Sequence, residues 1–182
     1  MELTTPTEAQ LPSYLEALSR RWSSNTMRSV VEEELASIRE DPALFLARQT
    51  DREARGPKIQ LADGQLVDRL PGFTMWMWDG EFCGSINLRW ASGTSALPPH
   101  VLGHIGYSVV PWKQRLGYAS SALGQLLPLA KAEGLDYVEL TTDEDNIASQ
   151  RVIERNGGVL LERFDFPNDY SDLEGLRYRI SL

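Results

Sequence analysis

Apolar residues recur at helical spacing through the first quarter of the chain. Thr7 and Gln10 fit a capping box, and the apolar positions that follow every three or four residues predict a helix over about 7–22. A second stretch of helical period covers 29–50. We expect it to break before Pro42, because a proline disfavours helical backbone at the residue that precedes it. The chain is therefore predicted to begin with a block of helices.

The period changes from helical to strand-like after a polar loop, marked by Gly and Pro, at 51–64. Two apolar runs, 73–78 and 82–90, flank the turn dipeptide Asp79-Gly80, which tolerates positive φ. This pattern predicts a β-hairpin. A third strand is expected at 104–110.

Strands and helices alternate in the second half of the chain. A helix is predicted over about 114–133, with Gly134 as its stop and a kink at Pro128, which cannot donate a backbone hydrogen bond. Asn146 begins a shorter helix that runs to Arg155. Strands are predicted at 135–142, 159–164 and 176–180. This order of elements predicts an α+β fold.

The composition is that of one globular domain. Of the 182 residues 42% are hydrophobic and 24% are charged, so we expect a single domain over 1–182, with N-terminal helices over about 7–50. The net charge of -8 argues against a nucleic-acid partner. The apolar stretch 119–132 is too short and interrupted for a membrane span, so no membrane partner is expected. The first residues lack a signal segment and Cys83 is the only cysteine, which favours a cytoplasmic location.

The start of the helix predicted at 114–133 is a candidate phosphate site. Gly117 and Ala119 are small, so a ligand can approach unpaired backbone N–H groups there, where the helix dipole also favours an anion. Taken alone, the same pattern is more often a sign of ordinary helix packing than of a phosphate loop.

A second polar motif begins at Asn146. Asn146, Ser149 and Ile153 lie along one face of the predicted helix. A capping Asn, a tolerated Ser and a core Ile explain the same residues without any ligand.

Together, the two motifs resemble those of the GNAT superfamily of acyl-CoA-dependent N-acetyltransferases. The first motif, a strand and a proline before Gln/Arg-x-x-Gly-x-Gly/Ala, is matched by Pro111, Gln114, Gly117 and Ala119. The second, Asn-x-x-Ser/Ala-x-x-φ-φ-Glu-Lys/Arg-x-Gly with φ apolar or Tyr, is matched by Asn146, Ser149, Val152, Ile153, Glu154, Arg155 and Gly157. From about Leu70 onward the chain is also similar to a bacterial branch of predicted acetyltransferases.

The resemblance implies a mixed, mostly antiparallel sheet with splayed central strands flanked by helices, and acetyl-CoA as cosubstrate. Pantetheine would lie in the gap between the splayed strands like an extra strand. The cofactor-binding half is expected over about 101–158. The residues implied in cofactor binding are Val109, Val110, Gln114, Arg115, Leu116, Gly117, Tyr118, Ala119, Ser120, Asn146 and Ser149.

The resemblance also implies direct attack of a neutral amine on the thioester. The family often has a Tyr as general acid seven residues after the Asn, and this chain has Ile153 there. Ser149 is the nearest replacement. A thiol with a pKa near about 8.5 needs little help to leave at neutral pH, so the loss of the acid is tolerable.

Three residues are candidates for the general base: His104 by its pKa, and Glu139 and Glu81 as carboxylates. Strand alternation places His104 on the face opposite the one that the family turns to the acceptor, which favours a structural role and leaves Glu139 as the preferred base. No metal site is expected, because His100, His104 and Cys83 have no paired spacing.

The expected partner is a primary amine of a small molecule or of a peptide N-terminus, bound by a monomer or a homodimer. Asn87 and Arg89 could line its pocket, although an exposed sheet face explains them equally well. Lys113 and Arg115 flank the phosphate motif, so an acidic chain can still bind CoA locally. The alternative is a non-catalytic acyl-CoA-binding or regulatory protein on the same fold, because Ile153 replaces the acid and no base is obvious.

Overall fold

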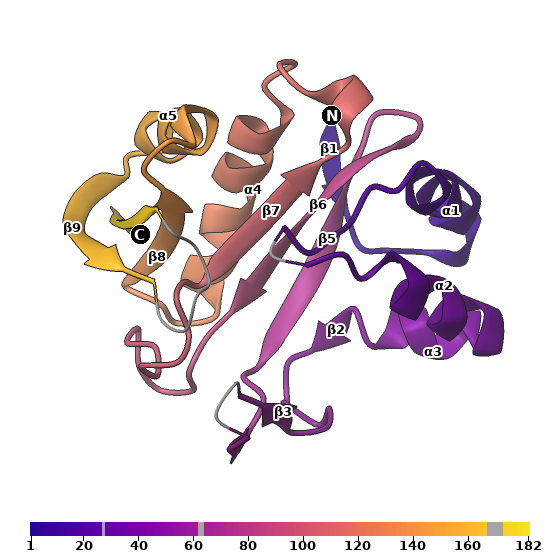
Figure 1. The fold of residues 1–182 in the computed structure, drawn as a ribbon, viewed down its shortest axis with the longest axis horizontal. Coiled ribbons are helices and arrows are strands. Elements are labelled where there is room, and N and C mark those ends of the chain that lie inside the picture. Colours follow the sequence, from indigo (N-terminus) through magenta and orange to yellow (C-terminus); the bar gives the residue numbers. More distant parts are fainter. Residues whose placement is uncertain (27, 62–63, 167–172) are drawn as a thin grey trace.

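The computed structural model describes residues 1–26, 28–61, 64–166 and 173–182. Its centre is formed by two sheets, which Figure 1 shows next to each other. The larger sheet has the strand order β1-β5-β6-β7, and β2 also pairs with β5. Its strands are β1 (Glu2–Thr4), β2 (Thr50–Asp51), β5 (Gly72–Trp78), β6 (Phe82–Arg89) and β7 (Ile105–Val109).

The smaller sheet has the order β8-β10-β9. Its strands are β8 (Tyr137–Asp143), β9 (Val159–Asp165) and β10 (Glu174–Ser181). A separate two-stranded ladder joins β3 (Ile59–Gln60) to β4 (Leu66–Val67). The ladders in all three sheets are antiparallel.

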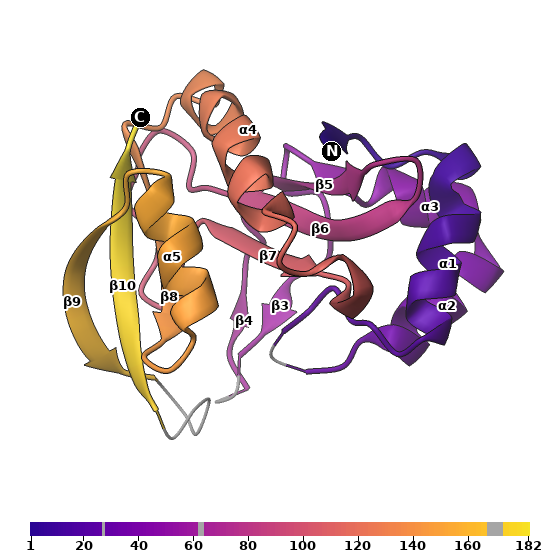
Figure 2. The ribbon, with the colours of Figure 1, turned by 90° about the horizontal axis from the view of Figure 1, so that it is seen from above.

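Helices cover both faces of the larger sheet (Figure 2). One face is covered by α1 (Leu11–Ser19), which follows the short 3-10 turn η1 (Glu8–Gln10), and by α2 (Val31–Glu40) and α3 (Pro42–Ala47). The opposite face is covered by α4 (Tyr118–Ala132), with α5 (Ile147–Arg155) between α4 and β8. A second 3-10 turn, η2 (Pro111–Lys113), leads from β7 toward α4.

Alternating residues of β5 bury their side chains on opposite faces, so the molecule has two hydrophobic cores. Met77 is fully buried in the core under α4, and Trp76 is buried in the core under α1–α3. The ring of Trp76 stacks on Tyr14 of α1, with centroids 4.5 Å apart. Such aromatic pairs add about 0.5–1.5 kcal/mol to the free energy of burial, and this one fixes the N-terminal helices on the sheet.

The two sheets meet where β7 begins. The N–H of His104 donates to the carbonyl of Glu139 at 2.7 Å. Gly103 permits this contact, because a Cβ at that position would lie only 3.1 Å from the same carbonyl oxygen. Among the described residues no ladder joins β7 to β8 beyond this point, and Figure 1 shows the two strands diverging. The sheets therefore splay apart and leave an opening between them.

Most of the predicted elements are confirmed. The first helix, the helix break before Pro42, the β5–β6 hairpin and the continuity of α4 through Pro128 are all present. The α+β fold class, with mostly antiparallel sheets, splayed central strands and flanking helices, is confirmed too. No helix among the described residues is long and apolar enough to cross a membrane.

Two local predictions were wrong, and two short strands, β1 and β4, were not predicted. The segment 51–64, expected as loop, contains the end of β2 and all of β3, while 62–63 lie outside the described residues. Strand β1 is too short to show a period and was not predicted. Helix α4 begins at Tyr118 and not near Gln114, because a 3-10 turn and the positive φ of Arg115 and Gly117 precede it.

Candidate active site

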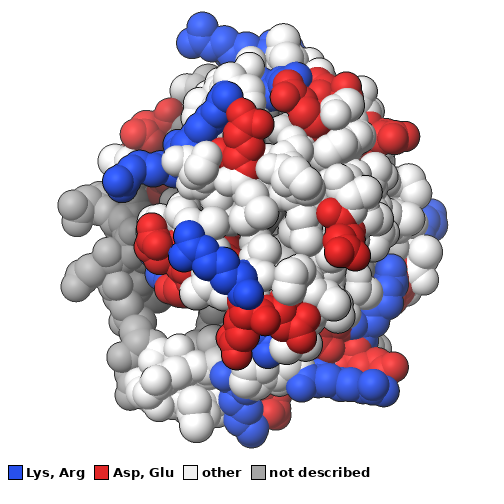
Figure 3. All heavy atoms as spheres, turned by 90° about the vertical axis from the view of Figure 1, so that its right-hand side faces the viewer, with Lys and Arg blue, Asp and Glu red and all other residues white. Residues whose placement is uncertain are grey.

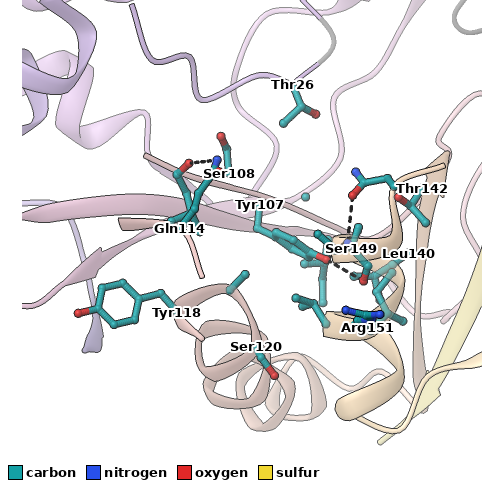
Figure 4. A pocket seen from close by; sticks show the side chains of 18 of the residues that line it. Thr26, Tyr107, Ser108, Gln114, Tyr118, Ser120, Leu140, Thr142, Ser149 and Arg151 are labelled. Atoms are coloured by element: carbon teal, nitrogen blue, oxygen red, sulfur yellow. Dashed lines mark hydrogen bonds between the residues drawn. The ribbon is translucent and has the colours of Figure 1, made fainter. Parts of the chain in front are cut away.

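The opening between the two sheets forms a cleft of about 830 Å³, called here the first cleft (Figure 4). Its walls are β7, the end of β8, the residues before and at the start of α4, and one side of α5. Each wall comes from a separate part of the chain, so only the tertiary fold brings these residues together.

One end of the first cleft is built to hold an anion. Gly117 is the residue before α4, with φ of 78° in the left-handed region that glycine adopts without strain. The first backbone bond of the helix runs from the N–H of Ser121 to the carbonyl of Gly117 at 3.0 Å. The N–H groups of residues 117–120 therefore have no acceptor within the helix, and all four residues line the cleft. This arrangement suits a phosphate.

Positive charge around the first cleft comes from three arginines. Arg115, Arg151 and Arg155 line the cleft, and the last two lie one helical turn apart on α5. Sequence reasoning did not single out Arg151 as a cleft residue, although the i, i+4 spacing of the two arginines was a readable signal. Lys113 also lines the cleft, but its ammonium is held by Asp79 at 2.9 Å and Glu81 at 2.6 Å.

The backbone of β7 presents a free edge to the first cleft. The N–H of Arg89 donates to the carbonyl of His104, and the N–H of Val110 donates to that of Cys83. Antiparallel ladders alternate, so the backbone groups of Tyr107 and Val109 point away from β6 and toward the cleft. The side chain of Gln114 turns back to the Val109 carbonyl at 3.4 Å (Figure 4).

Two residues of the expected cofactor set lie outside the lining of this cleft. Val110 is fully buried, its N–H is bonded to Cys83, and its carbonyl accepts from the N–H of Lys113 at 2.9 Å. Leu116 has a side chain that is 58% exposed to solvent. The other nine expected residues line the cleft: Val109, Gln114, Arg115, Gly117, Tyr118, Ala119, Ser120, Asn146 and Ser149.

Ser149 and Tyr107 face each other across the first cleft. The side chain of Asn146 accepts a hydrogen bond from the N–H of Ser149 at 3.0 Å, which caps α5 and fixes its first turn. The hydroxyl of Ser149 then lies 2.8 Å from the phenol oxygen of Tyr107 on β7 (Figure 4). Burial raises the pKa of Tyr107 to about 12, so its phenol keeps its proton at neutral pH.

A second cleft of about 720 Å³ lies against the α1–α3 side of the larger sheet. Asn87 and Arg89 line it, as the hairpin alternation allowed. The two clefts share five lining residues: Thr26, Ile105, Gly106, Tyr107 and Thr141. They therefore meet at the start of β7.

The sequence matches the acetyltransferase (GNAT) domain family over residues 3–159. The chain belongs to the GNAT acetyltransferase family. The match includes the N-terminal helices, which the motifs from Leu70 onward had not reached. No curated protein matches the sequence significantly.

Solved GNAT structures share the fold at low sequence identity. The microcin C7 self-immunity acetyltransferase MccE, in complex with acetyl-CoA and AMP, is 10% identical with a TM-score of 0.64, over 99% of this chain and 91% of that one. The ribosomal L7/L12 α-N-protein acetyltransferase RimL, in complex with coenzyme A, is 16% identical with a TM-score of 0.63, over 99% and 93%. Spermidine N-acetyltransferase SpeG from Vibrio cholerae is 12% identical with a TM-score of 0.62, over 100% and 95%.

The three base candidates lie outside both clefts of this GNAT fold. His104 is fully buried, its Nδ1 accepts from the N–H of Glu139 at 2.8 Å, and burial lowers its pKa. The carboxylate of Glu139 is bound by Arg179 at 2.6 Å and by Arg177 at 3.4 Å. Glu81 is half exposed and paired with Lys113. None of the three lines either cleft.

Ile153, at the position of the family's Tyr acid, is fully buried and belongs to the core under α4. Sequence reasoning did not consider Tyr107, whose phenol is the side chain best suited to the role of that Tyr acid. In the described part of the chain, no three His, Cys, Asp or Glu side chains are grouped so that they could hold a metal ion.

Proposed function

We propose that this GNAT chain transfers an acetyl group from acetyl-CoA to a primary amine of a small molecule or a peptide N-terminus. The observation that carries the proposal is the first cleft, which has free helix N–H groups at one end and the Ser149–Tyr107 pair at the other. Two of the three named relatives also point to amines, because their printed names describe a protein α-amine and spermidine as acceptors.

In the proposed complex the pyrophosphate of CoA binds the N–H groups of residues 117–120, with Arg115 and Arg151 nearby. The pantetheine arm extends β7 by hydrogen bonds to the backbone of Tyr107 and Val109. Nine of the eleven residues expected from the sequence keep this role. Val110 and Leu116 are left out, because their positions do not reach the cleft.

Acetyl-CoA supplies an activated acyl group. The protein orients it, with a backbone N–H of β7 placed to stabilise the oxyanion that forms on the thioester carbonyl. In this scheme Ser149 donates a hydrogen bond to the departing sulfur and the phenol of Tyr107 donates to Ser149. Both hydroxyls are neutral, and the task needs no group with a low pKa. The proposed active unit is the single domain 1–182, with its cofactor-binding half over about 101–158.

Replacing Gly117 by Val tests the cofactor site. The added side chain occupies the space through which a phosphate reaches the N–H groups, so we expect the thermal shift with acetyl-CoA to disappear. Gly93→Val is the matched control, because Gly93 has the same φ of 78°, equally open space, and no place in either cleft. Both variants bear the same backbone strain, and an unchanged shift in Gly117→Val would contradict the cofactor site.

The second candidate function is a non-catalytic acyl-CoA-binding or regulatory protein. It is favoured by one observation, namely that none of the three base candidates reaches the clefts. Release of free thiol, measured over a panel of amines, separates the two functions. Tight binding of CoA without amine-dependent thiol release would favour the regulatory role.

A further inference from the structure

Glu34 is a carboxylate in the wall of the second cleft that neither the motifs nor the proposed chemistry uses. It lies in the first turn of α2 and is half-buried. Its two oxygens accept hydrogen bonds from the hydroxyl of Tyr14 at 2.8 Å and from the hydroxyl of Ser24 at 2.7 Å. Both donors are neutral, and burial raises the pKa of Tyr14 well above its ordinary range, so its proton stays in place.

No cation neutralises this carboxylate within the described residues. None of their ion pairs includes Glu34, and burial raises its pKa above the ordinary value. Its neighbour Glu33 differs, because it is exposed and paired with Arg28. A half-buried charge without a countercharge is costly, and a cation bound in the cleft would offset that cost.

The remaining charged groups of the second cleft are more exposed than Glu34 or already engaged. Arg48, Asp68, Arg69, Arg89 and His100 are exposed. The carboxylate of Asp51 accepts from the backbone N–H of Arg55 at 2.8 Å and of Gly56 at 2.9 Å. Glu34 is thus the acidic group that the α1–α2 wall turns into the cleft, beside the stacked rings of Tyr14 and Trp76.

We propose that Glu34 binds an ammonium group of the acceptor and so selects cationic amines. This assignment rests on the proposed function, because it places the acceptor in the cleft that meets the first cleft at the start of β7. The ammonium is either the amine that becomes acetylated, before it loses its proton, or a second one on the same molecule. The chemistry that Glu34 recognises is the same in both cases.

Calorimetric titration of CoA-saturated protein with butylamine and with 1,4-diaminobutane tests the assignment without any need for turnover. Glu34→Gln keeps the shape and removes the charge, and we expect it to weaken amine binding by about tenfold or more, as for loss of a charge-assisted hydrogen bond. Weaker binding of both amines by Glu34→Gln identifies the amine that becomes acetylated as the group that Glu34 binds. Weaker binding of the diamine alone identifies a second ammonium on the same molecule as that group.

Glu33→Gln is the matched control, one position away on the same helix, and should bind both amines as the wild type does. A wild type that binds neither amine, or equal affinities in wild type and Glu34→Gln, would overturn the assignment. Thermal melting separates a structural role: loss of an unpaired buried charge should not lower Tm, whereas a lower Tm with unchanged affinity contradicts the proposal. Failure of the proposed function is seen in a different assay, as an absence of amine-dependent thiol release.

Discussion

In the proposed function, the pair of Ser149 and Tyr107 takes the place of one side chain in the family motif. The family's usual Tyr would come from α5, but here Ile153 of that helix is packed into the core. The phenol instead comes from β7 and meets the hydroxyl of Ser149 at 2.8 Å. A hydroxyl pair on two elements can therefore serve the departing thiolate as one Tyr does elsewhere.

Single and double substitutions of this pair test its role. We expect Ser149→Ala to lower kcat by about tenfold and Tyr107→Phe by less, since the Ser hydroxyl lies one bond closer to the sulfur in the proposed complex. The double variant should lose no more than Ser149→Ala, because the two hydroxyls act in series. Steady-state kinetics with saturating acetyl-CoA measure this, and an unchanged kcat in all three variants would mean that orientation alone drives the reaction.

At the residue scale, the sequence could place side chains that are related by helical spacing. Asn146 and Ser149 were found because a cap and its third residue are close in any helix. Tyr107 could not be paired with Ser149, because they are 42 positions apart in the sequence and only the packing of β7 against α5 brings them into contact. Glu34 was missed for the same reason, since its donors lie on other segments.

At the element scale, the loop before α4 is tied to the β5–β6 hairpin. Asp79, in the turn of that hairpin, accepts from the ammonium of Lys113 at 2.9 Å and from the hydroxyl of Tyr118 at 2.6 Å. Burial alone would raise the pKa of Asp79, but the hydrogen bonds from Tyr118 and Lys113 hold it well below its usual range. The turn thus holds Lys113 and Tyr118, which flank the loop that leads into the free N–H groups.

Loss of this link should weaken cofactor binding more than turnover. We expect Asp79→Asn to raise the KM for acetyl-CoA several-fold with kcat little changed, because the anion site loses its rigid support. Glu81→Gln is the control, since it removes the other partner of Lys113 and leaves the bond of Tyr118 intact. Equal KM values in the two variants would show that the hairpin does not position the loop.

The start of α4 shows two features that a residue pattern predicts poorly: the residue at which a helix begins, and which residues of a motif contact a ligand. Periodicity and Gly117 predicted the helix and its anion site, yet the true start at Tyr118 depends on positive φ values in the preceding loop. Leu116 and Val110 were assigned to the cofactor on the basis of position in a motif. Backbone direction decides such contacts, and only the three-dimensional register of β6 and β7 reveals it.

At the scale of the whole molecule, His104 lies at the junction of the two sheets. Its N–H bonds to Glu139 of β8, its carbonyl accepts from Arg89 of β6, and its Nδ1 accepts from the N–H of Glu139. Burial lowers its pKa below the ordinary 6.5, so the folded state takes up a proton less readily than the unfolded chain.

Acid should therefore weaken the whole fold through this junction. The unfolded state binds more protons below pH 6.5, so the free energy of unfolding should fall by up to about 1.4 kcal/mol per pH unit as pH drops through that value. Urea unfolding followed by Trp fluorescence measures this between about pH 7.5 and 5.5. His104→Asn retains an acceptor for the N–H and should flatten the slope, whereas the exposed His100→Gln should not; equal slopes would contradict the role of His104.

The distribution of surface charge is more informative than the net charge. The formal charge of -8 does not form a single acidic field on the face over the N-terminal helices, where Figure 3 shows acidic and basic side chains interspersed. Attraction of a cation at this side therefore depends on the interior of the second cleft and not on the outer surface.

The meeting of the two clefts at the start of β7 has a consequence for the order of events. In the proposed function the cofactor occupies the first cleft and the amine the second, on different sides of one strand, so neither needs the other to leave before it binds. Both can be present at once, which is the requirement for a ternary complex. A sequential kinetic pattern, with intersecting and not parallel double-reciprocal lines, follows from this arrangement of the chain.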